Sequence, residues 1–71
     1  MINEKIEIDF AYHPPEGNQA DLYQDLRWRA KSVAYVIDEI CPDSFEKETA
    51  MMKLNEVVFW ANAAIARYGG K

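Results

Sequence analysis

Cysteine and histidine are almost absent from this chain, which has one of each, Cys41 and His13, in 71 residues. A single cysteine excludes a disulfide within the chain, and one cysteine with one histidine is too small a set for a zinc site. The sequence also lacks a glycine-rich phosphate loop and a nucleophile that would form a recognised motif with His13. We therefore expect no metal, no cofactor and no enzymatic activity. The lone cysteine fits a reducing cytoplasm.

Long apolar runs are absent as well. No stretch approaches the roughly 20 apolar residues that span a bilayer. The first residues lack the basic start and the apolar segment of a signal peptide. We expect neither a leader nor a membrane partner.

Positive charge is scarce, because 8 Lys and Arg stand against 12 Asp and Glu, for a net charge of −4. Duplex DNA binding depends on neutralising many phosphates, so this balance disfavours a DNA-binding regulator. The joint between the two expected helices also lacks helix-turn-helix spacing. A failure to bind duplex DNA at moderate salt would set this class aside. One small anionic ligand held by a few local cations remains compatible with the charge.

The N-terminal part, residues 1–17, is predicted to be an arm followed by a turn. Apolar and acidic residues alternate from residue 5 to residue 12, which is typical of a short strand or an extended arm. His13-Pro14-Pro15 ends this pattern, because two prolines remove two N–H donors. The apolar positions of the alternation are Ile6, Ile8, Phe10 and Tyr12.

Two long helices are predicted to follow, at residues 18–41 and 44–68. Pro42 ends the first, Asp43 or Ser44 caps the second, and Gly69-Gly70 stops it. The short link makes the two helices antiparallel, so the expected fold is an all-α helical hairpin in a single domain. The apolar stripe of the first helix is Leu22, Leu26, Ala30, Val33, Ile37 and Ile40, and that of the second is Met51, Leu54, Val58, Ala61 and Ile65.

The stretch from Trp60 to Arg67 is apolar almost all round, apart from Asn62. A helix that is apolar on every side must be covered on every side. A chain this short buries only about 60% of its unfolded surface and has a weak core. We therefore expect a homo-oligomer that covers Phe59, Trp60, Ala63 and Ala66 between subunits. The alternative is that the N-terminal arm folds back over them.

The order and spacing of three motifs resemble the hairpin domain of phage cyclic-oligonucleotide sponges, the anti-CBASS sponge and its anti-Thoeris relative. These motifs are Tyr12-His13-Pro14-Pro15, Cys41-Pro42-Asp43-Ser44 and Trp60-Ala61-Asn62-Ala63-Ala64-Ile65-Ala66-Arg67. The resemblance implies a homohexamer that sequesters cyclic dinucleotides, and also cyclic trinucleotides, without chemistry on the ligand. It also implies the cytoplasm of an infected bacterial host. The chain has little sequence around the hairpin, which favours the anti-CBASS type.

Seven residues are candidates for binding such a ligand, whose phosphates require cations and whose bases require flat faces. Tyr23, Arg27 and Lys31 lie at i, i+4 and i+8 on one face of the first helix. The alternative for this set is a solvated basic face whose cations pair with nearby acids. Tyr12 and His13 stand beside the prolines, and their alternative is a role in the turn. The alternative for Asn62 is a hydrogen bond that sets the helix register, and that for Arg67 is an interaction with the helix dipole. The candidates are Tyr12, His13, Tyr23, Arg27, Lys31, Asn62 and Arg67.

A rival function from another class is a small interaction module or inhibitor. Such a protein would bind a host protein through the apolar helix face that contains Phe59 and Trp60. Titration against a panel of cyclic nucleotides separates this class from a sponge.

Overall fold

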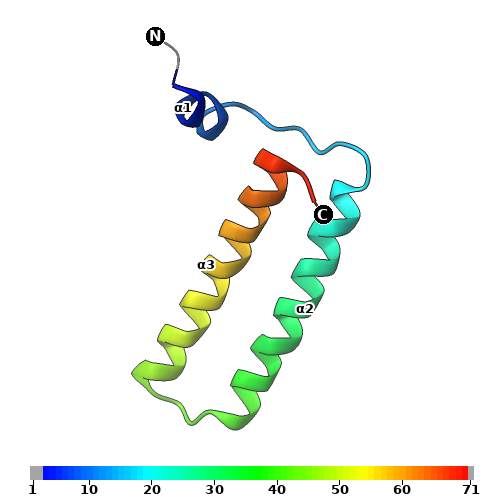
Figure 1. The fold of residues 1–71 in the computed structure, drawn as a ribbon. Coiled ribbons are helices and arrows are strands. Elements are labelled where there is room, and N and C mark those ends of the chain that lie inside the picture. Colours follow the sequence, from blue (N-terminus) through cyan, green and yellow to red (C-terminus); the bar gives the residue numbers. More distant parts are fainter. Residues whose placement is uncertain (1–2, 71) are drawn as a thin grey trace.

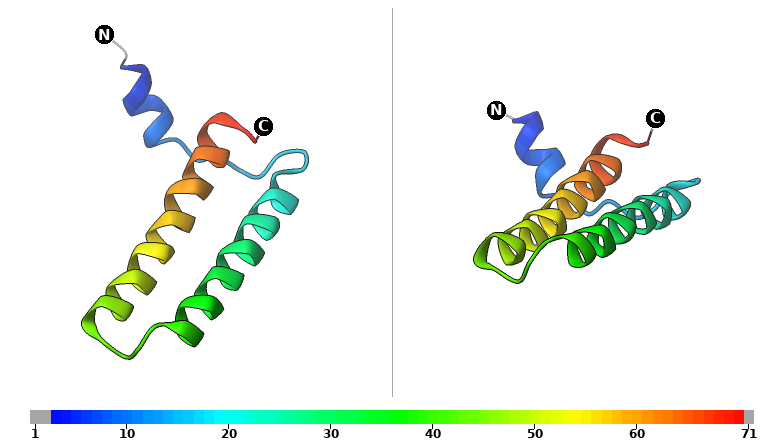
Figure 2. Two further views of the ribbon diagram at one scale, coloured as in Figure 1. Left: turned by 60° about the horizontal axis from the view of Figure 1, so that its bottom comes forward. Right: turned by 90° about the horizontal axis from the view of Figure 1, so that it is seen from below.

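The computed structural model describes residues 3–70, and these form three helices. Helix α1 spans Glu4–Asp9, α2 spans Gln19–Ile40 and α3 spans Phe45–Tyr68. Helices α2 and α3 lie side by side and antiparallel (Figure 1). Helix α1 lies beyond the open end of this hairpin, beside the last turns of α3 (Figures 1 and 2).

The ends of the two long helices confirm the expected hairpin. Helix α2 ends at Ile40, one residue before Cys41 and Pro42. The Ser44 hydroxyl caps α3 by accepting a hydrogen bond from the Lys47 amide at 3.1 Å. Gly69 ends α3 with a φ of 79°, a left-handed conformation that glycine adopts without strain. Of the two expected caps, Ser44 is therefore the one used.

The expectation of a strand or extended arm near the N-terminus is wrong. Residues 4–9 form a helix whose first turn is capped by the Asn3 side chain, which accepts from the Lys5 and Ile6 amides at 3.0 and 3.3 Å. An ion pair between Lys5 and Asp9, one turn apart, also stabilises it. These local contacts outweigh the alternation of apolar residues. Residues 10–18 then connect α1 to α2 without regular structure.

The apolar seam between α2 and α3 follows the expected stripes with two exceptions. All five stripe residues of α3 are half-buried. On α2, however, Val33 is 48% exposed and Ile40 is 72% exposed, so these two positions lie off the seam. Ala34 is half-buried instead, because α2 continues in steps of four residues from Ala30.

No residue among 3–70 is fully buried, so this chain has no closed core of its own. Phe59 is 67% exposed and Trp60 is 68% exposed. The alternative in which the N-terminal segment covers this face within one chain is therefore wrong for these two side chains, whereas Ala63 and Ala66 are half-buried. The apolar surface of Phe59 and Trp60 remains available to a neighbouring molecule.

Among the described residues, no helix is both long and apolar enough to cross a membrane.

Candidate functional site

The first candidate site is a groove between the two long helices, which we call the α2–α3 groove. Its volume of about 480 Å³ falls within the range of small-molecule pockets. The groove is lined by polar side chains from both helices and by apolar side chains of the seam. Its lining residues are Arg27, Ala30, Lys31, Ala34, Met51, Leu54, Asn55, Val58, Phe59 and Asn62.

Arg27 and Lys31 contribute the positive charge of the α2–α3 groove. They are exposed and one helical turn apart, and neither forms an ion pair within residues 3–70. Arg27 donates to the Gln24 amide oxygen at 3.5 Å, and the Lys31 ammonium lies 5.9 Å from the centre of the Trp28 ring. The alternative is that the cations of this face pair with nearby acids. Of Arg27, Arg29 and Lys31, Arg29 alone does so, with Asp25 at 3.1 Å.

Asn62 lies on the α3 wall of the α2–α3 groove. Its side-chain oxygen Oδ1 is buried and has no hydrogen-bond partner. A buried polar atom without a partner costs roughly 1–3 kcal/mol. A hydrogen-bond donor that reached this atom, from water, a ligand or a neighbouring chain, would remove this cost.

The second candidate site lies at the open end of the hairpin, where the proline segment passes the end of α3. We call it the arm groove, and its volume is about 320 Å³. It is more polar than the α2–α3 groove and contains one acid, Glu16. Its lining residues are Tyr12, His13, Pro14, Glu16, Gln19, Ala66, Arg67 and Gly69.

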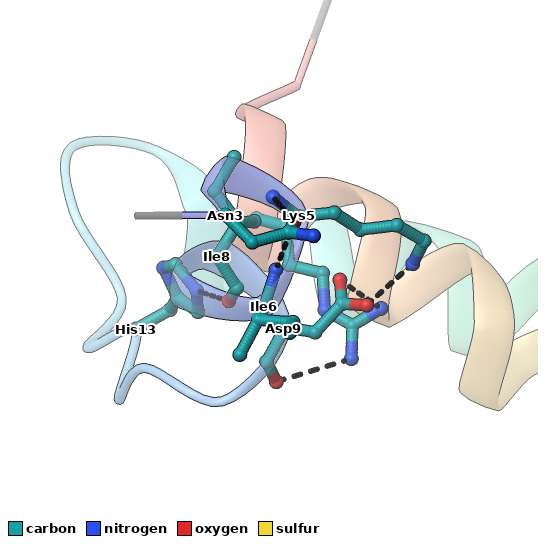
Figure 3. A network of polar contacts seen from close by, with 7 residues as sticks. Asn3, Lys5, Ile6, Ile8, Asp9 and His13 are labelled. Carbon is teal, nitrogen blue, oxygen red and sulfur yellow. Dashed lines mark hydrogen bonds and ion pairs between the residues drawn. The ribbon is translucent and has the colours of Figure 1, made fainter. Parts of the chain in front are cut away.

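The proline segment is held in place by two polar side chains. His13 is half-buried, and its Nε2 lies 2.7 Å from the carbonyl oxygen of Ile8 (Figure 3). Because a carbonyl only accepts, Nε2 donates this hydrogen bond. Gln19 donates to the carbonyl of Ile65 at 3.2 Å and accepts from the Glu16 amide at 3.0 Å. Tyr12 is 84% exposed, so its ring is available for stacking.

Arg67 joins the arm groove to helix α1. Its Nη1 lies 3.5 Å from the Asp9 carboxylate, and its Nη2 donates to the Asp9 carbonyl at 3.5 Å. Lys5 hydrogen-bonds the same carboxylate (Figure 3). The hydrogen bond from Lys5, reinforced by the charges of Lys5 and Arg67, lowers the pKa of Asp9 below its usual value. Asp9 is thus held as an anion between two cations.

The structure sorts the seven candidates into two separate sets. Arg27, Lys31 and Asn62 line the α2–α3 groove, whereas Tyr12, His13 and Arg67 line the arm groove. Tyr23 lines neither groove, although it shares a helical face with Arg27 and Lys31. A site that combines members of both sets therefore extends over both grooves.

Sequence reasoning missed three polar residues of the arm groove region, namely Asp9, Glu16 and Gln19. Gln19 and Asp9 contact residues 46 and 58 positions away in the sequence, and no local pattern signals such pairs. Across residues 3–70, His, Cys, Asp and Glu side chains form no cluster that could hold a metal ion.

Comparison with known proteins identifies the family. No curated protein and no solved structure matches the chain. The family model described as Acb2/Tad1, hairpin domain, matches residues 2–66, which include all three helices apart from the end of α3. The match therefore covers the hairpin and both candidate grooves up to residue 66. This protein belongs to the Acb2/Tad1 hairpin-domain family.

Proposed function

We propose that this protein is a sponge that binds and sequesters cyclic oligonucleotide second messengers without degrading them. Membership of the Acb2/Tad1 hairpin family fits a sponge-type role. The observation that carries the proposal is the α2–α3 groove, which is lined by two cations without acidic partners among residues 3–70 and by an amide whose oxygen lacks a partner. Phosphates would satisfy the cations, and the amino group of a base would satisfy the amide.

Cyclic dinucleotides are the first proposed ligands. Such a ring has two phosphates and two bases, so a twofold junction between copies matches it by supplying each residue twice. Arg27 or Lys31 of each copy would hold one phosphate, and Tyr12 of each copy would stack on one base. Tyr12 and Arg27 line different grooves of one chain, and in the proposed site they would reach the ligand from different copies.

Cyclic trinucleotides are the second proposed ligands. Their three phosphates match a threefold axis, on which each copy would contribute Arg67, with Asn62 as a base contact. A dihedral hexamer has both twofold and threefold axes, so one short chain would form both types of site. Three Arg67 side chains near an axis would repel one another, Asp9 would offset part of this repulsion, and a ligand with three phosphates would relieve the rest.

A hexamer is the proposed assembly. It would cover the exposed rings of Phe59 and Trp60 and compensate for the absence of a fully buried residue in the described chain. The cytoplasm of an infected bacterial host is the proposed location, because a sponge must meet the messengers where they are made.

Native mass spectrometry with a panel of cyclic di- and trinucleotides tests the function. The expected result is a hexamer that binds at least one of these ligands and releases it unchanged after denaturation. Release of linear or hydrolysed products would indicate an enzyme. A hexamer that binds no ligand in the panel would contradict the sponge function.

A second candidate function is an inhibitor that binds a host protein through Phe59 and Trp60. The exposure of these rings, 67% and 68%, favours it in a monomer. Native mass spectrometry of the free protein separates the two candidates, because a hexamer that covers these rings leaves no such surface.

A further inference from the structure

Arg67, the proposed phosphate ligand, already has an anionic partner in the free chain. Both of its terminal nitrogens contact Asp9, one at the carboxylate and one at the carbonyl, each at 3.5 Å. The two side chains are 28% and 20% exposed, so solvent only partly screens the pair. A phosphate that approaches Arg67 must therefore displace or share the Asp9 carboxylate.

Helix α1 has little else to hold it against the hairpin. Its six residues are too few for a stable isolated helix. Its apolar side chains are poorly covered, with Ile6 53% exposed, and Phe10 just after it is 86% exposed. Ile8 is half-buried. The polar contacts from residues 4–9 to residues beyond Phe10 are that of Asp9 with Arg67 and that of the Ile8 carbonyl with His13. Loss of the Asp9–Arg67 pair would leave α1 attached through its contact with His13 and the partial burial of Ile8.

We propose that Asp9 competes with the ligand phosphate for Arg67, so that phosphate binding releases helix α1 from the end of α3. This inference rests on the proposed function and assigns Asp9 a role that opposes binding. Asp9 is then a determinant of specificity, because only a ligand that offers Arg67 a better anion than a carboxylate displaces it.

Replacement of the Asp9 carboxylate by a ligand phosphate at Arg67 leaves none of these charged groups without a partner. Lys5 and Asp9 are one turn apart on α1, so a displaced Asp9 keeps its contact with Lys5. Arg67 meanwhile gains a phosphate, which accepts two parallel hydrogen bonds from a guanidinium as a carboxylate does. The pKa of Asp9 is lowered mainly by the Lys5 hydrogen bond. The carboxylate therefore stays ionised and competes at neutral pH.

Isothermal titration of cyclic triadenosine monophosphate into the full-length protein and matched variants tests the inference. Asp9→Asn keeps the shape of the side chain and removes its charge. Glu7→Gln removes the same charge from the same helix, and Glu7 forms no ion pair in the described part of the chain. We expect Asp9→Asn to bind about two- to fivefold more tightly than wild type, as expected for removal of one partly exposed ion pair. Glu7→Gln should bind within about twofold of wild type.

A second measurement follows α1 itself. Hydrogen exchange at the amides of residues 4–10 should accelerate when wild type binds the ligand and should already be fast in free Asp9→Asn. In an Arg67→Ala background, Asp9→Asn should no longer change the affinity. Equal binding by wild type and Asp9→Asn, or an equal gain with Arg67→Ala present, would overturn the inference and leave the sponge function intact. If neither wild type nor Asp9→Asn binds any cyclic nucleotide, the sponge function fails and this inference fails with it.

Discussion

The basic side chains of this acidic chain differ in what they contact. Among residues 3–70, Arg27 and Lys31 have no acidic partner and line the α2–α3 groove, whereas Arg67 pairs with Asp9 beside the arm groove. The remaining cations form ion pairs outside both grooves; they are Lys5, Arg29, Lys47 and Lys53. Arg27, Lys31 and Arg67 are therefore the cations that a phosphate ligand would meet.

Arg67→Ala should weaken binding of cyclic trinucleotides and leave binding of cyclic dinucleotides nearly unchanged, because Arg67 belongs to the proposed threefold site and not to the proposed twofold site. Arg29→Ala is the matched control, since Arg29 pairs with Asp25 away from both grooves. Competition calorimetry measures both ligands in one sample. If a saturating dinucleotide blocks the trinucleotide, the two ligands share a site and the proposal of separate sites is wrong.

Tyr12→Ala should weaken cyclic dinucleotide binding by roughly 1–3 kcal/mol, the usual contribution of an aromatic ring stacked on a base. Tyr12 is 84% exposed in the free chain, so its removal should cost little stability. Tyr35→Ala is the control, because Tyr35 is also exposed, at 65%, and lines neither groove. Wild-type affinity in both Tyr12→Ala and Arg27→Ala would place the dinucleotide site elsewhere.

Helix α1 depends on its N-terminal cap more than the long helices do, because it has only six residues. Asn3→Ala removes the side-chain oxygen that accepts from the Lys5 and Ile6 amides. We expect residues 4–9 to lose helical chemical shifts in NMR spectra while α2 and α3 keep theirs, since such a cap contributes about 0.5–2 kcal/mol. Asn18→Ala is the control, because Asn18 precedes α2 without a side-chain cap bond. Unchanged shifts in Asn3→Ala would show that the cap is not needed.

Lys47 clamps the closed end of the hairpin. Its ammonium, whose side chain is 13% exposed, lies 3.2 Å from the Asp43 carboxylate and 3.3 Å from that of Asp38. The hydrogen bond with Asp43, followed by the hydrogen bond with Asp38 and the charges of both acids, raises the pKa of Lys47 above its usual value. The clamp links α2 to α3 across the turn.

The raised pKa of Lys47 determines the pH range in which its ion pairs with Asp38 and Asp43 stabilise the fold. Its contribution is complete below the usual lysine pKa of about 10.4 and is lost as the pH rises through the raised folded-state value. Thermal melts of wild type and Lys47→Met should therefore differ in Tm at pH 7–9 and converge at higher pH. A Tm difference that persists unchanged above pH 12 would mean that packing of the Lys47 stem, and not its charge, is responsible.

The sequence predicted the long helices because their ends carry strong local signals. Pro42, the Ser44 hydroxyl and Gly69 act within one turn of the chain, and all four observed helix ends lie within one residue of the predicted ones, with Phe45 and Tyr68 bounding α3. Helix α1 was missed because alternation over residues 5–12 resembles a strand. The Asn3 cap and the Lys5–Asp9 pair, which decide the structure there, are weaker sequence signals.

Assembly of several copies of the chain is expected to bury Trp60, which is 68% exposed in a single chain. Trp60→Glu should give monomeric, unfolded or aggregated protein, because it would place a charge without a partner in the interface. Trp60→Phe keeps an apolar ring and should remain assembled. Sedimentation velocity at micromolar concentration measures both variants. A wild-type chain that sediments as a well-folded monomer would contradict the account of the interface.

The candidate site could be predicted only in part, because packing across the whole molecule determines which of its residues share a groove. Charge and aromatic character singled out Arg27, Lys31 and Tyr12 from the sequence. The division into two grooves, and the contact of Arg67 with Asp9, depend on how the N-terminal segment returns to the end of α3. Helical periodicity describes one helix at a time, so it also grouped Tyr23 with Arg27, although Tyr23 lines neither groove.

The central claim, that this chain binds cyclic oligonucleotides as an oligomer, is tested most directly by native mass spectrometry of the wild-type protein with and without a panel of cyclic di- and trinucleotides. The measurement reports the number of subunits and the number of bound ligands in the same spectrum. The account predicts a hexamer whose mass increases by whole ligands, and ligands recovered intact after denaturation. A monomer, or a hexamer whose mass does not change with any ligand of the panel, would contradict it.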